Sequence, residues 1–214
     1  MTHYNDHLAD YITGLFAPQD AATIRALTES PQRGLPAISI KPEEGKFLQM
    51  LTRMCAARKA VEIGTLGGYS GIWIARGLLP GGKLVTLEKE PRHAAVAREH
   101  FEAANVLDRV EIRIGDAHES LKSLAAEGPF DFVFIDAEKS GYAAYYEWAM
   151  THVRLGGLVT AHNAFRGGAV ADPNDHTSDT EAMRAFNAQV AADSRGLATI
   201  YPGGDGMVVV VKTG

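Results

Sequence analysis

From residue 58 to the end of this 214-residue chain, short runs rich in β-branched and aromatic residues alternate with longer segments in which apolar residues recur every three or four positions. This alternation is typical of a parallel sheet whose strands are joined by helices, since a parallel crossover needs roughly a dozen residues or more. The apolar spacing predicts helices at 69–78, 91–105, 117–126, 140–152 and 178–192. The expected strands are Ala60–Ile63, Lys83–Leu87, Val110–Ile114, Phe132–Ile135, Gly157–Thr160, Ala198–Tyr201 and Met207–Val211.

The last two expected strands are separated only by the turn 202–206, which contains Pro202 and three glycines. A turn of that length is too short for a parallel crossover, so this pair should form an antiparallel hairpin. Residues 1–57 show helical patterns and no strand. We therefore expect one α/β domain over residues 1–214, with a helical cap (1–57) over one end of a Rossmann-like core (58–214). Its seven-stranded sheet would be mostly parallel, with an antiparallel C-terminal hairpin and helices on both faces.

Composition excludes several classes of protein. Hydrophobic residues make up 46% and charged residues 22%, as in ordinary globular chains. A net charge of -5 argues against a nucleic-acid or anionic-membrane partner, which would need clustered Lys and Arg. No segment approaches the ~20 apolar residues that span a bilayer, so a cytoplasmic location is expected. The single cysteine, Cys55, lies in an apolar-periodic segment and is interpreted as a buried structural thiol.

A glycine-rich turn follows the first expected strand, where doubly wound sheets bind ligands. Its glycines stand at 64, 67, 68 and 71, which does not match the dinucleotide spacing and argues against a nicotinamide-dependent dehydrogenase. Glu88 lies twenty residues after Gly68, at the end of the second strand, where a carboxylate can accept both hydroxyls of a ribose. These features predict an adenosine ligand. A second acid, Glu62, would organise the turn or lie near an ammonium group of the ligand.

The turn VEIGTLGGYSG (61–71) resembles motif I of class I methyltransferases, specifically of the catechol and caffeoyl-CoA O-methyltransferase family. The resemblance extends over nearly the whole chain. The further matching segments are KPEEGKFLQML (41–51), GDAHESL (115–121), DFVFIDAEKSGY (131–142), LGGLVTAHNAFRGG (155–168) and GGDGM (203–207).

The resemblance implies S-adenosylmethionine as cofactor and assigns a part of that molecule to each matching position. Glu88 would hold the ribose, Ala117 would lie by the adenine and Ile40 would line the pocket. Asp136, at the end of the fourth strand, would lie at the junction with the acceptor. The positions assigned to the methionine part are Glu62, Gly64, Thr65 and Ser70, with Tyr69 adjoining. The family resemblance also implies a homodimer.

Methyl transfer to oxygen requires that the acceptor hydroxyl be aligned and deprotonated. In the family's pattern, one Asp and an Asp-Asn pair hold a divalent metal that lowers the pKa of a phenol. Here Asp136 and Asn163 match, but His162 stands at the position of the second Asp. Because Mg²⁺ prefers oxygen ligands, two alternatives remain. Either a softer divalent metal is held by Asp136, His162 and Asn163, or no metal is required and His162 is the general base; we favour the second.

Lys139, three residues after Asp136, matches a family lysine near the acceptor hydroxyl and would take its proton or stabilise a phenolate. Tyr142, Trp148 and Phe165 are candidates for aromatic walls of the acceptor site or for core residues. The expected activity is O-methylation of a small catechol-like aromatic with vicinal hydroxyls. The alternatives are the dehydrogenase considered above and a cofactor-binding protein without catalysis.

Overall fold

The computed structural model describes residues 4–214, in which seven strands form one sheet in the order β3-β2-β1-β4-β5-β7-β6. The five strands β1 to β5 pair in parallel, and β7 is antiparallel to both β5 and β6. The expected Rossmann-like sheet with an antiparallel C-terminal hairpin is therefore confirmed. The strands are β1 (Lys59–Ile63), β2 (Lys83–Glu88), β3 (Val110–Ile114), β4 (Phe130–Ile135), β5 (Val153–Ala161), β6 (Gly196–Tyr201) and β7 (Met207–Lys212).

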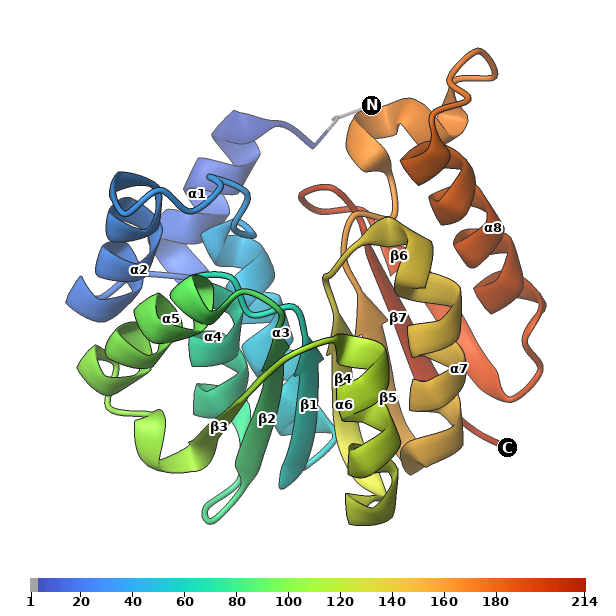
Figure 1. The fold of residues 1–214 in the computed structure, drawn as a ribbon. Helices are drawn as coiled ribbons and strands as arrows, with labels where there is room; N and C mark the ends of the chain where they lie inside the picture. Colours follow the sequence, from blue (N-terminus) through green and yellow to red (C-terminus); the bar gives the residue numbers. More distant parts are fainter. Residues whose placement is uncertain (1–3) are drawn as a thin grey trace.

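Helices cover both faces of the sheet, as expected (Figure 1). On one face lie α2, α3, α4 and α5, and on the other lie α6, α7 and α8. The helices are α1 (Asp6–Phe16), α2 (Ala21–Gln32), α3 (Pro42–Met54), α4 (Tyr69–Gly77), α5 (Pro91–Ala103), α6 (Ala117–Leu124), α7 (Tyr142–His152) and α8 (Ser178–Ala192).

Alternating side chains of the strands divide the interior into two apolar cores. Ala60 of β1 contributes to the core beneath α3 and α4, whereas the next residue, Val61, contributes to the core beneath α6 and α7. Both faces of β1 and β4 are thus sealed by apolar packing. A polar ligand has access to these strands only at their ends, as the doubly wound topology implies.

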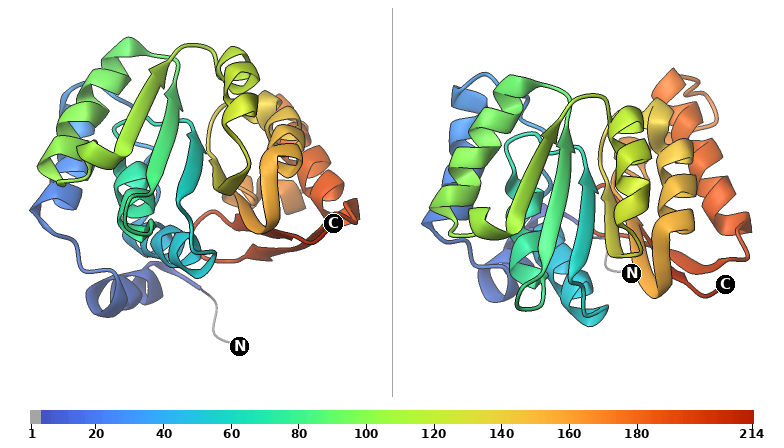
Figure 2. Two further views of the ribbon diagram at one scale, coloured as in Figure 1. Left: turned by 90° about the horizontal axis from the view of Figure 1, so that it is seen from below. Right: turned by 60° about the horizontal axis from the view of Figure 1, so that its bottom comes forward.

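The N-terminal helices form part of the layer on one face of the sheet. α3 packs against α4, α1 packs against α3, and α2 packs against α5. Both views in Figure 2 keep these blue helices on one side of the sheet and the yellow-to-orange α7 and α8 on the other. They are therefore more than a cap over one end, because Leu48 and Leu51 of α3 belong to the core itself. The division of the chain at residue 57 remains a prediction.

One strand boundary needs correction. β5 begins at Val153, four residues earlier than Gly157, because α7 runs directly into the strand. The segment that follows β5 contains the 3-10 helix Arg166–Ala171. The side chain of Arg184 in α8 fixes this segment by donating hydrogen bonds to the carbonyl oxygens of Ala169, Val170, Asp172 and Asp175.

Two further expectations concern whole-chain properties. Within residues 4–214, no helix combines the length and the apolar character that crossing a membrane would require. Cys55 is buried, and this burial raises the pKa of its thiol to about 11. Such a thiol is unreactive near neutral pH, in agreement with a structural role.

Candidate active site

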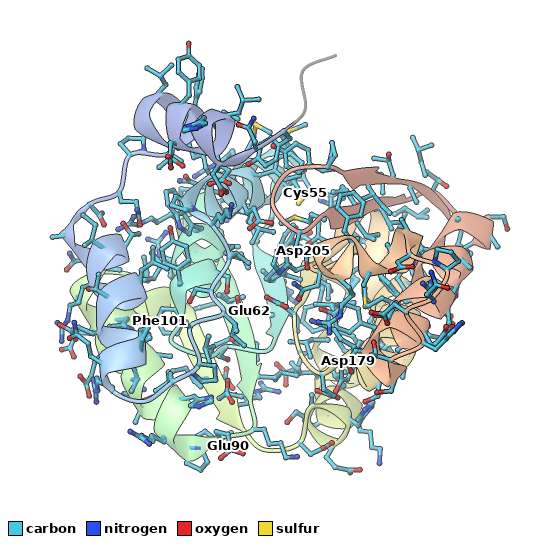
Figure 3. The ribbon with its side chains drawn as sticks, turned by 90° about the horizontal axis from the view of Figure 1, so that it is seen from above. Cys55, Glu62, Glu90, Phe101, Asp179 and Asp205 are labelled. Atoms are coloured by element: carbon cyan, nitrogen blue, oxygen red, sulfur yellow. The ribbon has the colours of Figure 1, made fainter. Side chains whose placement is uncertain are left out.

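A cavity of about 640 Å³ opens at the carboxyl ends of β1, β2, β3 and β4. Its volume lies in the range typical of small-molecule sites. Figure 3 views this edge from above, with Glu62 near the centre, Phe101 to its left, and Asp179 and Asp205 to its right. The lining segments are 38–40, 64–67, 69–70, 87–89, 115–117 and 136–139, together with Tyr145, Asn163, Arg166 and Asp179.

The glycine-rich turn joins β1 to α4 and forms one wall of the cavity. Gly64 has a φ of +98°, and a Cβ atom on it would lie 2.1 Å from the carbonyl oxygen of Asp136. Only glycine fits there, because the ends of β1 and β4 approach so closely. Gly68 begins α4 in the left-handed conformation. The backbone path of the turn is therefore set by the glycines that the sequence pattern singled out.

Glu62 lies beneath the turn and is fully buried. Its carboxylate accepts hydrogen bonds of 2.6 Å from Ser70 Oγ and from Thr86 Oγ1. Burial raises the pKa of Glu62 to about 7. The residue is absent from the cavity lining, so its surroundings favour the role of organising the turn over contact with a ligand's ammonium group.

Glu88 stands at the end of β2 and lines the cavity. One carboxylate oxygen accepts hydrogen bonds from the backbone N–H groups of Thr65 (3.3 Å) and Leu66 (2.8 Å), and the other accepts one from Glu90 (2.9 Å). These bonds fix the carboxylate against the glycine turn. A carboxylate has about four acceptor positions, so it can still accept from a ribose.

The remaining cofactor candidates also lie together. Ile40, which precedes α3, and Ala117, the first residue of α6, both line the cavity although they are far apart in the sequence. Asp116 caps α6 by accepting a hydrogen bond of 3.2 Å from the N–H of Glu119. The lining candidates on the turn are Gly64, Thr65, Tyr69 and Ser70.

Asp136 and Lys139 line the cavity just beyond the end of β4. Lys139 Nζ lies 3.4 Å from Asp136 Oδ1, donates to the carbonyl oxygen of Ala137 at 3.1 Å and to Tyr142 Oη at 2.7 Å. Burial lowers the pKa of Lys139, although the negative charge of Asp136 opposes this effect. Burial alone would raise the pKa of Asp136, but the hydrogen bond from His162 and the charges of His162 and Lys139 bring it below its usual range.

His162 is buried behind Asp136 and does not line the cavity. Its Nε2 lies 2.8 Å from Glu44 Oε1 on α3, and its Nδ1 lies 3.5 Å from Asp136 Oδ2. Burial disfavours the imidazolium, yet the hydrogen bonds to Asp136 and Glu44 raise the pKa of His162 to about 10. A protonated, enclosed imidazole cannot accept a proton from an acceptor in the cavity. This geometry argues against the expectation that His162 is the general base.

Asn163 lines the cavity, but its side chain is hydrogen-bonded to a residue that does not line the cavity. Nδ2 donates a hydrogen bond of 2.9 Å to Asp205 Oδ2, in the turn between β6 and β7. The other oxygen of Asp205 accepts from the N–H of Gly167 at 2.6 Å. The β6–β7 turn therefore fixes the segment that follows β5.

The predicted metal ligands Asp136, His162 and Asn163 do not form a ligand set in this arrangement. His162 faces two carboxylates as a cation, and Asn163 is bonded to Asp205. Within residues 4–214, no three His, Cys, Asp or Glu side chains are grouped so that they could hold a metal ion. A divalent cation beside Asp136 would also meet the charges of Lys139 and His162. These donors do not fit a divalent metal.

Sequence reasoning missed several residues of this site. Glu44 and Asp205 lie within the matching segments 41–51 and 203–207, which were the available signal, but their partners are far away in the chain. Arg166 and Asp179 carried no motif that would place them on the cavity. Of the two roles left open for Tyr142, Trp148 and Phe165, the structure supports the core role. The aromatic residue of the α7 helix that lines the cavity is Tyr145.

Comparison with known proteins identifies the family. Residues 18–213 match the family model described as O-methyltransferase. A catechol O-methyltransferase of Niastella koreensis is 43% identical over 192 residues, which cover 89% of this chain and 87% of that protein. One of Mycobacterium tuberculosis is 42% identical over 176 residues, with coverage of 82% and 80%. The crystal structure of an O-methyltransferase from Bacillus cereus in complex with SAH has a TM-score of 0.89 and 40% identity, and covers 96% of this chain and 97% of that one. The chain therefore belongs to the O-methyltransferase family and resembles its catechol O-methyltransferases.

Proposed function

We propose that this protein transfers the methyl group of S-adenosylmethionine to a hydroxyl of a small catechol-like aromatic. The observation that carries the proposal is that one cavity is lined both by the glycine turn and Glu88 and by Asp136 and Lys139. Such a cavity can hold a nucleoside and an acceptor side by side. The similar structure from Bacillus cereus was solved with SAH, the demethylated product of this cofactor, which supports the cofactor half of the proposal.

The turn and Glu88 would bind and orient the cofactor. Backbone groups of the turn approach the ligand closely because Gly64 has no side chain. Glu88 would accept hydrogen bonds from the ribose hydroxyls, and Ile40 and Ala117 would exclude water from the adenosine. Thr65, Tyr69 and Ser70 would contact the methionine part. S-adenosylmethionine supplies an electrophilic methyl group on sulfur.

Lys139 is the residue that we propose as proton acceptor. Its Nζ is next to the cavity, and burial lowers its pKa, which increases the fraction of neutral amine. The neutral amine would take the proton of the acceptor hydroxyl, the oxygen would form a bond to the methyl carbon, and the electron pair of the broken carbon–sulfur bond would go to sulfur. The products are a methyl ether, S-adenosylhomocysteine and protonated Lys139.

His162 then has a positioning role in place of the base role expected from sequence. Its imidazolium connects Asp136 to Glu44 and keeps the Asp136 carboxylate ionised near Lys139. The donor set around Asp136 does not fit a divalent cation, which argues against the metal-dependent alternative.

The proposed function is tested by incubating the protein with isotopically labelled S-adenosylmethionine and catechol, and with phenol as the matched acceptor that lacks the vicinal hydroxyl. We expect label in the catechol product and much less in phenol. Calorimetry with S-adenosylhomocysteine and with NAD provides the control for the cofactor, since only the former should bind. Binding of S-adenosylhomocysteine without turnover of any catechol would instead support a cofactor-binding protein without catalysis.

A further inference from the structure

Arg166 occupies the acceptor end of the cavity and has unsatisfied hydrogen-bonding capacity. It lines the cavity together with Lys139, Asn163 and Asp179. Its Nε is buried and has no hydrogen-bond partner among the residues that the structure describes. One terminal nitrogen lies 3.2 Å from Asp179 Oδ2, and the Asp179 side chain is half exposed (51%). An arginine carries five N–H donors, so this single ion pair leaves most of them free.

Two other arginines, Arg154 and Arg195, are engaged more completely. Arg154 donates to Asp131 and to two backbone carbonyl oxygens, and Arg195 forms paired hydrogen bonds with Glu147. A buried donor without a partner is costly, and a donor of this kind that lines a cavity can gain its missing hydrogen bond from a ligand. Of the arginines, only Arg166 is part of the cavity lining given by residues 4–214.

The backbone also fixes Arg166 at this position. Its φ is +50°, and that of Asn163 is +59°, so both side chains project from left-handed backbone that is unfavourable for residues other than glycine. Such conformations persist only where the surroundings impose them, and they are concentrated at ligand sites. Here Asp205 imposes the conformation by bonding Asn163 and Gly167 on either side of Arg166.

Arg166 is near the reacting end of the cavity. Arg166 and Lys139 are both lining residues of this cavity. The charged lining residues at this end are Asp136, Glu138, Lys139, Arg166 and Asp179. The anions already have partners, because Asp136 contacts Lys139 and His162, and Glu138 accepts from Tyr145 Oη. The free donors of Arg166 are therefore the unsatisfied groups that an acceptor would meet.

We propose that Arg166 binds a carboxylate of the acceptor, so that the preferred acceptors are aromatic acids with vicinal hydroxyls rather than neutral catechols. The planar guanidinium matches a carboxylate in two parallel hydrogen bonds, and such a contact orients as well as binds. The inference rests on the proposed function, since it names the acceptor class of the same site.

The test compares 3,4-dihydroxybenzoate with its methyl ester. Both carry a carbonyl group at the same position of the ring, but only the acid carries a charge that Arg166 can bind. We expect kcat/KM for the acid to exceed that for the ester by about tenfold or more in the wild type, mainly through KM, and this ratio to fall to about one in Arg166→Gln. Arg166→Lys should keep part of the preference.

A matched control is Arg109→Gln, which removes an arginine that also has a buried Nε without a partner but lies outside the cavity lining. Its acid-to-ester ratio should equal that of the wild type.

Methylation of catechol and ester without a preference for the acid would overturn this inference and leave the proposed function intact. A preference that persists in Arg166→Gln would overturn the assignment to Arg166. If catechol, acid and ester all remain unmethylated, the proposed function is overturned and this inference with it.

Discussion

At the scale of single residues, the site depends on one carboxylate that contacts two basic side chains. Asp136 contacts Lys139 on the side of the cavity and His162 on the side of the protein interior. The sequence placed all three residues near the reacting end. It could not assign their protonation, because the second partner of His162 is Glu44, which lies 118 residues away in the chain. That contact makes His162 a buried cation, and we therefore propose as the base Lys139, which lines the cavity.

Replacing Lys139 with Gln removes the proposed proton acceptor. We expect kcat for catechol methylation to fall by about 10²–10⁴-fold, with little change in the affinity for S-adenosylhomocysteine. Steady-state kinetics and calorimetry measure the two effects. Lys122→Gln is the control, because Lys122 is an exposed lysine on α6 paired only with Glu119. Unchanged kcat in Lys139→Gln would remove Lys139 from the chemistry.

At the scale of elements, the β1–α4 turn determines where the cofactor can bind. The glycine pattern predicted this turn because it is local in sequence and the left-handed positions require glycine. The Asp205 contact could not be predicted in the same way, since it depends on how the β6–β7 hairpin lies beside the segment after β5. The local glycine pattern therefore predicts the cofactor part of the site. The acceptor part depends largely on tertiary contacts, which a local sequence pattern does not reveal.

Gly64→Ala tests this turn. The added Cβ would lie 2.1 Å from the Asp136 carbonyl oxygen, so the ends of β1 and β4 must separate. We expect loss of measurable binding of S-adenosylhomocysteine and a destabilisation larger than the ~1–2 kcal/mol of left-handed strain alone. Gly81→Ala isolates that strain, since Gly81 has a φ of +76° and the nearest atom lies 4.0 Å from its added Cβ. Equal destabilisation in both variants, measured by urea unfolding, would show that the close approach is unimportant.

At the scale of the whole molecule, alternation of strands and helices predicted the sheet, its hairpin and both helical layers. It did not predict that α3 packs on α4, because the apolar pattern of residues 1–57 indicates helices without saying which surface they cover. The acid Glu62 was placed correctly at the end of β1. The hydrogen bonds that it accepts from Ser70 of α4 and Thr86 of β2 were visible only once the chain was folded. The expected homodimer remains a prediction.

Glu62 and His162 give the stability of the whole protein a pH dependence. The pKa of Glu62 is raised by burial from 4.5 to about 7, and that of His162 is raised from 6.5 to about 10 by its hydrogen bonds to Asp136 and Glu44, against the effect of burial. Both groups bind protons more tightly when folded, so their stabilising contributions are complete below the unfolded pKa and are lost as pH rises through the folded value.

We expect the contribution of Glu62 to be lost between pH 4.5 and 7, and that of His162 between pH 6.5 and 10. Urea unfolding at pH 5 and pH 7.5 should show a decrease for the wild type. In Glu62→Gln this decrease should be smaller by about 2 kcal/mol, because the titrating group is gone. The same decrease in wild type and variant would mean that Glu62 titrates normally in the folded protein.

The central claim is that this cavity transfers a methyl group to a catechol-type hydroxyl through its own side chains, with Lys139 taking the proton. The most direct test is methylation of 3,4-dihydroxybenzoate and catechol by metal-stripped protein with labelled S-adenosylmethionine, in chelator and with added Mg²⁺, Mn²⁺ or Zn²⁺. Methylation that continues at a similar rate in chelator is the predicted result. Methylation that appears only after a divalent metal is added would contradict it and make Asp136, His162 and Asn163 the ligands of that metal.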